Sequence, residues 1–332
     1  MSAEEDLLYG LLATRRDRLA ELVGGTGGTG GNPQERLVEL LRRVDSALDA
    51  GEAGLRLARP LCAVCGEIVT VGELDGERAI RVCLDCLTPE ERRGLEKDLE
   101  KAAEVQRALL PPRRFAQDGW EVAWLWEPLG VVSGDHIDLL PPRGPGEATH
   151  LIFGDVAGKG VAASLLQSLL YALFRGLAEA PVTELLAQAN RRFCAATTTA
   201  SYATLIALCL HPEGRLELAN AGHLRPLYAD RRGVRPIEGS GFPLGLFCEA
   251  AYTGHEVQVG TGDSVLLYSD GWTEAAVGDE EFGIGRAAAA LRRHAELPLP
   301  QLLTACRQDM ESFLAGAPRV DDLSLVVLRR TG

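Results

Sequence analysis

The chain has 332 residues, of which 46% are hydrophobic and 24% charged, a composition typical of globular proteins with room for two or three domains. Its net charge of -13 repels the phosphate backbone of nucleic acids, so we expect no direct nucleic-acid binding. The acidic first residues lack a signal-peptide pattern, and the leucine-rich stretch 162–177 is interrupted by Gln167 and Arg175, so we expect no membrane segment.

The first 58 residues have the pattern of a helical hairpin. Leucines recur at spacings of three and four residues over Ala3–Val23, and a similar apolar pattern returns over Leu37–Ala50. The run Gly24–Pro33 between them is rich in Gly and Thr, which interrupts a helix. We therefore predict a hairpin over residues 1–58 with a glycine-rich tip.

Residues 59–88 contain two Cys-x-x-Cys pairs, Cys62 with Cys65 and Cys83 with Cys86. Four thiolates at this spacing suit one tetrahedral, structural Zn²⁺, and metal binding would supply the folding energy of so short a segment. Redox chemistry is the alternative for Cys-x-x-Cys, but two pairs in one short segment fit a closed zinc site better. We predict a four-cysteine zinc finger here.

The other four cysteines are scattered among apolar residues: Cys194, Cys209, Cys248 and Cys306. This pattern is typical of proteins that keep their thiols reduced, so we expect a cytoplasmic protein.

A connecting helix is predicted over residues 89–111. Thr88 supplies an N-cap, Pro89 suits the first helical position, and the glutamates that follow can complete a capping box. Apolar and amide side chains then follow at spacings of three and four residues, at Leu95, Leu99, Ala102, Gln106 and Leu109. This seam could join two copies in a homodimer or pack within one chain.

Residues 112–332 alternate between short strands and helices, which predicts one mixed α+β domain. The clearest strand patterns are 121–126, 149–156, 202–210, 264–268 and 323–328. The helical patterns between them are 162–178, 182–196, 284–295 and 300–314. Sheets flanked by helices would bury the apolar faces of both kinds of element.

Four aspartates lie at the predicted ends of strands: Asp135, Asp155, Asp270 and Asp321. Each alone, beside glycine or another turn residue, is explained by ordinary turn chemistry. Together they match the needs of a two-metal site, because Mg²⁺ and Mn²⁺ prefer carboxylate, carbonyl and water oxygens. The set therefore predicts a site for two divalent cations assembled from distant parts of the chain.

A phosphate-binding P-loop is the competing interpretation of Gly154–Gly160. The spacing between Gly154 and Lys159 suits such a loop, but Gly160 stands where the motif requires Ser or Thr. We therefore favour the metal site and keep ATP binding as the alternative.

Several motifs occur in an order that resembles one enzyme family: Val-Ser-Gly-Asp, Gly-Asp-Val-Ala-Gly-Lys-Gly, Asn-Ala-Gly-His, Pro-Leu-Gly, Tyr-Ser-Asp-Gly-Trp-Thr-Glu and Asp-Asp-Leu-Ser. They resemble the SpoIIE-like branch of the PPM metal-dependent serine/threonine protein phosphatases, over about residues 100–330. The resemblance implies a sandwich of two antiparallel sheets flanked by helices, with two Mn²⁺ or Mg²⁺ ions between the sheets.

The resemblance also implies roles for particular residues. Asp155 would bridge both metals, and Asp270 and Asp321 would complete the shell of one. The carbonyl of Val156 would bind the other, Asp135 would act directly or through water, and Asp322 is a neighbouring candidate ligand. The metals would activate a water for in-line attack on a phosphoserine or phosphothreonine. For this branch the phosphoprotein substrate is often a small anti-sigma-factor antagonist in bacterial signalling.

Residues 1–90 resemble the DksA/TraR zinc finger, which is attached to a helical hairpin. In that family acidic residues at the hairpin tip enter a channel of RNA polymerase, whereas the tip here, 24–31, carries no carboxylate. We therefore do not expect polymerase binding and interpret the module as a sensor or scaffold. An inactive phosphatase-like scaffold that uses the zinc module to bind transcription machinery is the alternative for the whole chain.

Overall fold

The computed structural model describes residues 89–142, 144, 147–177, 180–197 and 201–332. The predicted hairpin (1–58) and zinc finger (59–88), with Cys62, Cys65, Cys83 and Cys86, lie outside these residues. Contacts divide the chain after Gly94 into two units, and the second unit runs from Leu95 to Gly332. Within the described residues, no helix combines the length and apolar character needed to cross a membrane.

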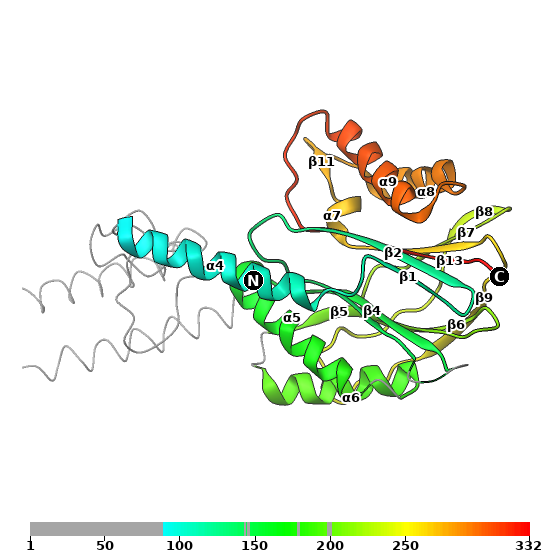
Figure 1. Ribbon diagram of the computed structural model, residues 1–332, viewed down its shortest axis with the longest axis horizontal. Coiled ribbons are helices and arrows are strands. Elements are labelled where there is room, and N and C mark those ends of the chain that lie inside the picture. Colours follow the sequence, from blue (N-terminus) through cyan, green and yellow to red (C-terminus); the bar gives the residue numbers. More distant parts are fainter. Residues whose placement is uncertain (1–88, 143, 145–146, 178–179, 198–200) are drawn as a thin grey trace, which may run out of the picture. The chain divides into compact units, whose positions relative to one another are not determined.

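Two antiparallel sheets form the centre of this unit (Figure 1). The six-stranded sheet has the order β1 (Arg114–Gln117), β2 (Trp120–Glu127), β13 (Leu323–Arg330), β10 (Ser264–Tyr268), β7 (Leu227–Asp230) and β8 (Gly233–Pro236). The five-stranded sheet has the order β3 (Asp135–Leu140), β4 (Thr149–Val156), β5 (Ala203–Leu210), β6 (Arg215–Ala221) and β9 (Gly254–Gln258). A small hairpin pairs β11 (Ala276–Val277) with β12 (Glu280–Glu281).

Helices cover the outer face of each sheet (Figure 1). In chain order, the helices of the described residues are α4 (Pro89–Leu109), α5 (Gly160–Arg175), α6 (Val182–Ala196), α7 (Asp270–Thr273), α8 (Gly283–His294) and α9 (Leu299–Leu314). Helices α5 and α6 pack on the five-stranded sheet, and α8 and α9 pack on the six-stranded sheet. The expected sandwich of antiparallel sheets flanked by helices is confirmed.

Strand β4 illustrates why the central strands are apolar on both faces. Leu151 and Phe153 point into the core between the two sheets, whereas Ile152 and Val156 pack under α5 and α6. Because side chains alternate across a strand, a strand covered on both faces must be apolar at successive positions. A polar residue in such a strand is therefore conspicuous, and Asp155 is one.

The connecting helix α4 packs on its own domain through its C-terminal half. Ala103 and Gln106 are buried, whereas Leu95, the first residue of the predicted seam, is 40% exposed. At Gln106 the predicted seam therefore packs within the chain. The homodimer remains a prediction.

The expectation of four unpaired cysteines in this part of the chain was wrong for two of them. Cys194 at the end of α6 and Cys248 form a disulfide, with their Cα atoms 5.8 Å apart. Asn190 on α6 brings the two segments together, because its amide donates to the carbonyls of Phe247 and Cys248. Pairing across 54 residues of sequence could not be read from spacing, and these two cysteines no longer argue for a reducing compartment.

Candidate active site

The four aspartates meet at one edge of the sandwich. Asp155 lies near the end of β4 and Asp270 follows β10, whereas Asp135 begins β3 and Asp321 precedes β13. Two of the aspartates thus stand at or after the ends of strands, whereas Asp135 and Asp321 stand at or before the starts of strands. Since neighbouring antiparallel strands run in opposite directions, the start of one strand lies beside the end of the next, and the carboxylates still gather at one edge.

Asp135 and Asp155 are cross-strand partners in the β3–β4 register. Side chains directly opposite each other in an antiparallel pair share one face, with Cβ atoms about 5 Å apart. Gly134 sits against this pair, since a Cβ atom there would lie 2.9 Å from both Asp155 Oδ1 and the Val156 carbonyl oxygen. The missing side chain leaves room for these two oxygens, which belong to the carboxylate and the carbonyl that the family resemblance implies as metal ligands.

A cleft of about 210 Å³ opens beside Asp155 and Asp270. Its other lining residues are Thr204, Gly222, His223, Leu224 and Glu274. Because Asp155 and Asp270 come from different sheets, the cleft lies where the two sheets meet. It gives a small polar group access to both carboxylates.

A second cleft, of about 300 Å³, contains Asp321, Asp322 and Lys159. Lys159, which immediately precedes α5, places its Nζ 2.8 Å from Asp321 Oδ2 and 3.0 Å from the Val320 carbonyl oxygen. The lysine of the P-loop alternative therefore pairs with an aspartate of the acidic cluster, by which we mean Asp135, Asp155, Asp270, Asp321 and Asp322. The apolar side of this cleft includes Leu99 of α4.

Asp322 holds the loop that leads into β3. Its Oδ1 accepts from the backbone N–H of Leu129 at 2.6 Å, and its Oδ2 accepts from the Ser133 hydroxyl at 2.6 Å and the Gly134 N–H at 3.2 Å. Three donors thus occupy this carboxylate. The side chain positions the Gly134 turn that lies against Asp155.

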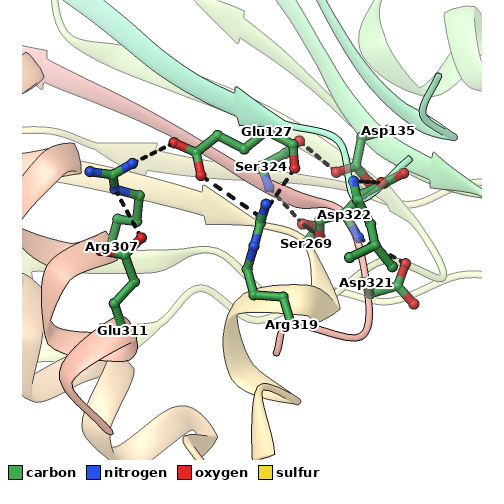
Figure 2. Close-up of polar contacts among 10 residues, drawn as sticks. Glu127, Asp135, Ser269, Arg307, Glu311, Arg319, Asp321, Asp322 and Ser324 are labelled. Carbon is green, nitrogen blue, oxygen red and sulfur yellow. Dashed lines mark hydrogen bonds and ion pairs between the residues drawn. The ribbon is translucent and has the colours of Figure 1, made fainter. Parts of the chain in front are cut away.

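Two serines complete the polar network: Ser324 of β13, and Ser269, which follows β10 (Figure 2). The Ser324 hydroxyl donates to Asp135 Oδ2 at 2.5 Å, and the Ser324 N–H donates to the Ser269 oxygen at 2.9 Å. The Ser269 hydroxyl in turn donates to the carbonyl of Asp322 at 3.2 Å. These bonds fix the orientation of Asp135 relative to the Asp321–Asp322 backbone.

The segment before Asp321 is tied to β2 by a charged group (Figure 2). Arg319 donates to the Glu127 carbonyl at 3.1 Å, and Arg307 of α9 donates to the Glu127 carboxylate at 2.8 Å. Both arginines therefore converge on the last residue of β2. The bonds help to set where the chain crosses the edge of the sheet at Asp321.

The acidic cluster carries more negative charge than the protein itself neutralises. Burial, and then the charges of Asp270, Asp321 and Asp322, raise the pKa of Asp155 to about 7. Burial and the charge of Asp155 hold the pKa of Asp135 well above its usual range, and burial followed by the charge of Asp321 raises the pKa of Asp270.

The residues present fit a pair of hard divalent cations. Among the described residues, Lys159 is the basic side chain that forms an ion pair with the cluster, and the aspartate that it pairs with is Asp321. The donor set is all oxygen, and the space at Gly134 keeps Asp155 Oδ1 and the Val156 carbonyl close together. A bound cation would relieve the repulsion that raises these pKa values.

Two buried histidines near the cluster are neutral. His223 Nε2 lies 3.2 Å from the Tyr268 carbonyl, so its Nδ1 accepts from the Thr204 hydroxyl at 2.8 Å. Burial lowers the pKa of His223 to about 4 and that of His136 to about 3. His223 therefore orders the cleft wall, and His136 packs inside the domain, where Gln167 bonds its Nδ1 at 3.2 Å.

Sequence reasoning missed the residues that orient the carboxylates. Ser133, Ser269 and Ser324 stand inside the family motifs, one or two residues from an aspartate, but serine close to aspartate is also ordinary turn chemistry. Gln106 was assigned to an apolar seam. A buried amide in an otherwise apolar stripe is the signal that could have identified it.

A family model described as Stage II sporulation protein E (SpoIIE) matches residues 145–331. Phosphoserine phosphatase RsbU of Bacillus subtilis is 24% identical over 185 residues, which cover 54% of this chain and 54% of RsbU. Protein IcfG of Synechocystis is 22% identical over 266 residues, 70% of this chain and 41% of IcfG. The chain thus spans about half or less of the length of these curated relatives.

Solved structures show the same fold. The SiaA-PP2C domain of Pseudomonas aeruginosa superposes with a TM-score of 0.62 at 23% identity, covering 72% of this chain and 98% of that domain. The RsbU and RsbW domains of Rv1364c from Mycobacterium tuberculosis give a TM-score of 0.56 at 26% identity, with coverages of 64% and 60%. Because the family model spans more than half of the 332 residues, the chain belongs to the SpoIIE family.

Proposed function

We propose that this protein is a metal-dependent phosphatase that hydrolyses phosphoserine or phosphothreonine on a protein, using two Mn²⁺ or Mg²⁺ ions. The observation that carries the proposal is the convergence of Asp135 of β3, Asp155 of β4 and Asp270, which follows β10, with pKa values raised by burial and by neighbouring carboxylates. Membership of the SpoIIE family and the similarity to phosphoserine phosphatase RsbU support it.

We assign the metal ligands by motif and position. Asp155 would bridge the two metals, Asp270 and Asp321 would complete one shell, and the Val156 carbonyl would bind the second metal. Asp135 would act directly or through water, oriented by Ser324. For Asp322 we favour the positioning of the Gly134 turn, because three donors already occupy its carboxylate.

When bound, the metals would supply an activated water and would neutralise charge on the phosphate. The side chains of the protein would position the metals and the substrate. Asp155 and Asp270 present their carboxylates to the 210 Å³ cleft, where a phosphorylated side chain could approach between Leu224 and Glu274. Lys159 places a positive charge at Asp321, on the edge of the acidic cluster.

The substrate and setting follow the family resemblance. We propose a phosphoprotein of a bacterial regulatory pathway, with a small anti-sigma-factor antagonist as the first candidate, acted on in the cytoplasm. Acidic repulsion at the protein surface disfavours nucleic acid as a substrate, since the net charge is -13.

We also propose the domain order predicted from sequence: a hairpin over 1–58, a zinc finger with one structural Zn²⁺ over 59–88, a connecting helix over 89–111 and the phosphatase domain over 112–332. Binding of RNA polymerase is not part of the proposal, since residues 24–31 contain no carboxylate. We also propose a homodimer through α4, because Leu95 and Val105 expose apolar surface on that helix. Light scattering would test it.

The deciding experiment measures Mn²⁺-dependent phosphate release from a phosphoserine peptide by the full chain. Asp155→Asn and Asp270→Asn should each abolish it while the fold, followed by circular dichroism, is retained. Asp279→Asn is the matched control, because Asp279 is an exposed aspartate between β11 and β12. A parent inactive with both Mn²⁺ and Mg²⁺, on several phosphopeptides, would favour the scaffold alternative.

A further inference from the structure

A second group of metal-binding side chains lies at the far end of the five-stranded sheet. The thiol of Cys209, the ring of His211 and the carboxylate of Glu217 place their ligand atoms within 4.8 Å of one another. Cys209 is near the end of β5, His211 follows that strand, and Glu217 lies on β6. The group is therefore built on one β-hairpin.

The sheet register adds a fourth candidate ligand. His150 of β4 pairs with Cys209, and Cys209 pairs with Glu217. Residues paired in this way stand in one row on one face of the sheet. His150 also hydrogen-bonds to the backbone of Ala180, a contact that orients its ring.

This group is separate from the acidic cluster. His150 is the second residue of β4, and Asp155 follows five residues later, so the two sites are about 17 Å apart along this strand. The chemistry also differs, because a thiolate, imidazoles and one carboxylate suit Zn²⁺ and its neighbours among the transition metals rather than Mg²⁺.

The guanidinium of Arg215 already binds two members of the group formed by Cys209, His211 and Glu217. Arg215 donates to His211 Nδ1 at 3.0 Å and to Glu217 Oε1, and its guanidinium lies 3.7 Å from Glu256 Oε1. Because a guanidinium only donates, His211 Nδ1 presents its lone pair to this cation. The ring's other nitrogen, Nε2, is buried without a well-oriented hydrogen bond although Glu217 Oε1 is 3.0 Å away.

We propose that Cys209, His211 and Glu217, with His150 as the fourth ligand, form a binding site for a divalent transition metal ion of the Zn²⁺ class, which displaces the guanidinium of Arg215. Arg215 is one-third exposed, so it can turn to solvent, where Glu213 is a second partner. The bound ion would cross-link β4, β5 and β6.

Binding must release the thiol proton of Cys209 to solvent. Burial, and then the charge of Glu217, raise the pKa of this thiol to about 12 in the metal-free protein. Affinity should therefore increase with pH, as for any site that exchanges a thiol proton for a metal.

The test uses the full chain, stripped with a chelator and titrated with Co²⁺, whose thiolate charge-transfer absorption reports cysteine ligands. Cys209→Ser should bind one Co²⁺ fewer per chain than the parent and lose one thiolate's share of that absorption. Cys306→Ser is the matched control, since Cys306 is the other free buried cysteine among the described residues. Equal Co²⁺ content and absorption in the parent and Cys209→Ser would overturn the proposal.

Two further variants keep the test decisive if Cys209→Ser fails to fold. His211→Gln, at the partly exposed turn, should lose the same Co²⁺. Arg215→Gln should bind it more tightly than the parent, because the competing cation is gone. Unchanged Co²⁺ binding in both variants would overturn the proposal, and phosphatase activity is not a readout of either.

Discussion

Gln106 of α4 and Ser133 exchange two hydrogen bonds that join the connecting helix to the acidic cluster. The Gln106 amide donates to the Ser133 carbonyl at 2.6 Å, and the Ser133 N–H donates back to Gln106 Oε1 at 3.0 Å. The Ser133 hydroxyl bonds Asp322 at 2.6 Å and accepts from the Asp135 N–H at 3.0 Å. One buried amide therefore links α4 to two of the aspartates.

Replacing Gln106 by alanine should weaken the acidic site. The change leaves the buried backbone groups of Ser133 without a partner, at a cost of about 1–3 kcal/mol. We expect a lower unfolding temperature and a higher Mn²⁺ concentration for half-maximal activity. Glu104→Ala, on the exposed side of α4, is the control, since within the part of the chain that the structure describes Glu104 hydrogen-bonds to Lys101. Identical Mn²⁺ dependence in Gln106→Ala and the parent would show that the link does not act on the site.

Gly134→Ala should reduce metal-dependent activity in a folded protein. A Cβ atom at Gly134 would come within 2.9 Å of Asp155 Oδ1 and the Val156 carbonyl, so those oxygens must shift. Displaced ligands should lower metal affinity by more than the roughly 10–100-fold typical of changes outside the ligand shell. Calorimetric titration with Mn²⁺ measures this.

Gly130→Ala is the matched control for that variant, because its nearest neighbour would be the Val132 carbonyl at 3.7 Å, an ordinary contact. Loss of affinity in both variants would point to a general effect on the 129–134 loop rather than to the space at Gly134.

Without metal, the charge of Asp155 should destabilise the fold as pH rises. Its pKa is raised to about 7 from an ordinary value of about 3.9, so the folded state keeps a proton that the unfolded chain releases. The free energy of unfolding therefore falls as the pH rises from about 4 to about 7. Buried neutral His136 and His223, with lowered pKa values, act in the opposite direction.

The difference between the parent and Asp155→Asn isolates this effect. In a chelator, Asp155→Asn should unfold at a higher temperature than the parent, and the gap should widen from about pH 5 to about pH 8. Adding Mn²⁺ should reverse the order, because only the parent gains a bound ion. A gap that is constant with pH would contradict the raised pKa.

Much of the fold could be predicted because both faces of the central strands are covered. The apolar run Thr149–Val156 and the amphipathic Val182–Ala196 were found with the bounds that the structure gives. Strand β3 was missed, since Asp135, His136 and Asp138 make half of its six residues polar. All three are buried, which only tertiary contacts such as Arg175 with Asp138 explain.

The aspartates of the candidate site were identifiable from motifs, but their supports were not. Nothing local marks Ser324 as the partner of Asp135, because the two are 189 residues apart in sequence. Gln106 lies 27 residues before Ser133 and on another element. Hydrogen bonds over such separations depend on the packed sheets, so the sequence predicts the charged groups before it predicts what orients them.

The Cys194–Cys248 disulfide should stabilise the oxidised protein. Closing a loop across 54 residues contributes about 2–4 kcal/mol, mainly by restricting the unfolded chain. Cys194→Ser should therefore lower the unfolding temperature under oxidising conditions and leave it unchanged in excess dithiothreitol. Cys209→Ser, which removes a free thiol and keeps the disulfide, should lose stability in dithiothreitol as the parent does. An equal response of the parent and Cys194→Ser would mean that the pair stays reduced.

Because Asp135 pairs with Asp155, the site is sensitive to insertions and deletions in the β3–β4 hairpin. The effect depends on where in the hairpin they occur. A one-residue insertion inside either strand turns every following side chain to the opposite face, which would separate the two carboxylates while the strands could still pair. The connection between Leu140 and Thr149 lies at the other end of both strands, so its length can vary without altering the acidic edge. Relatives with this hairpin should therefore differ in the connection and agree in strand length.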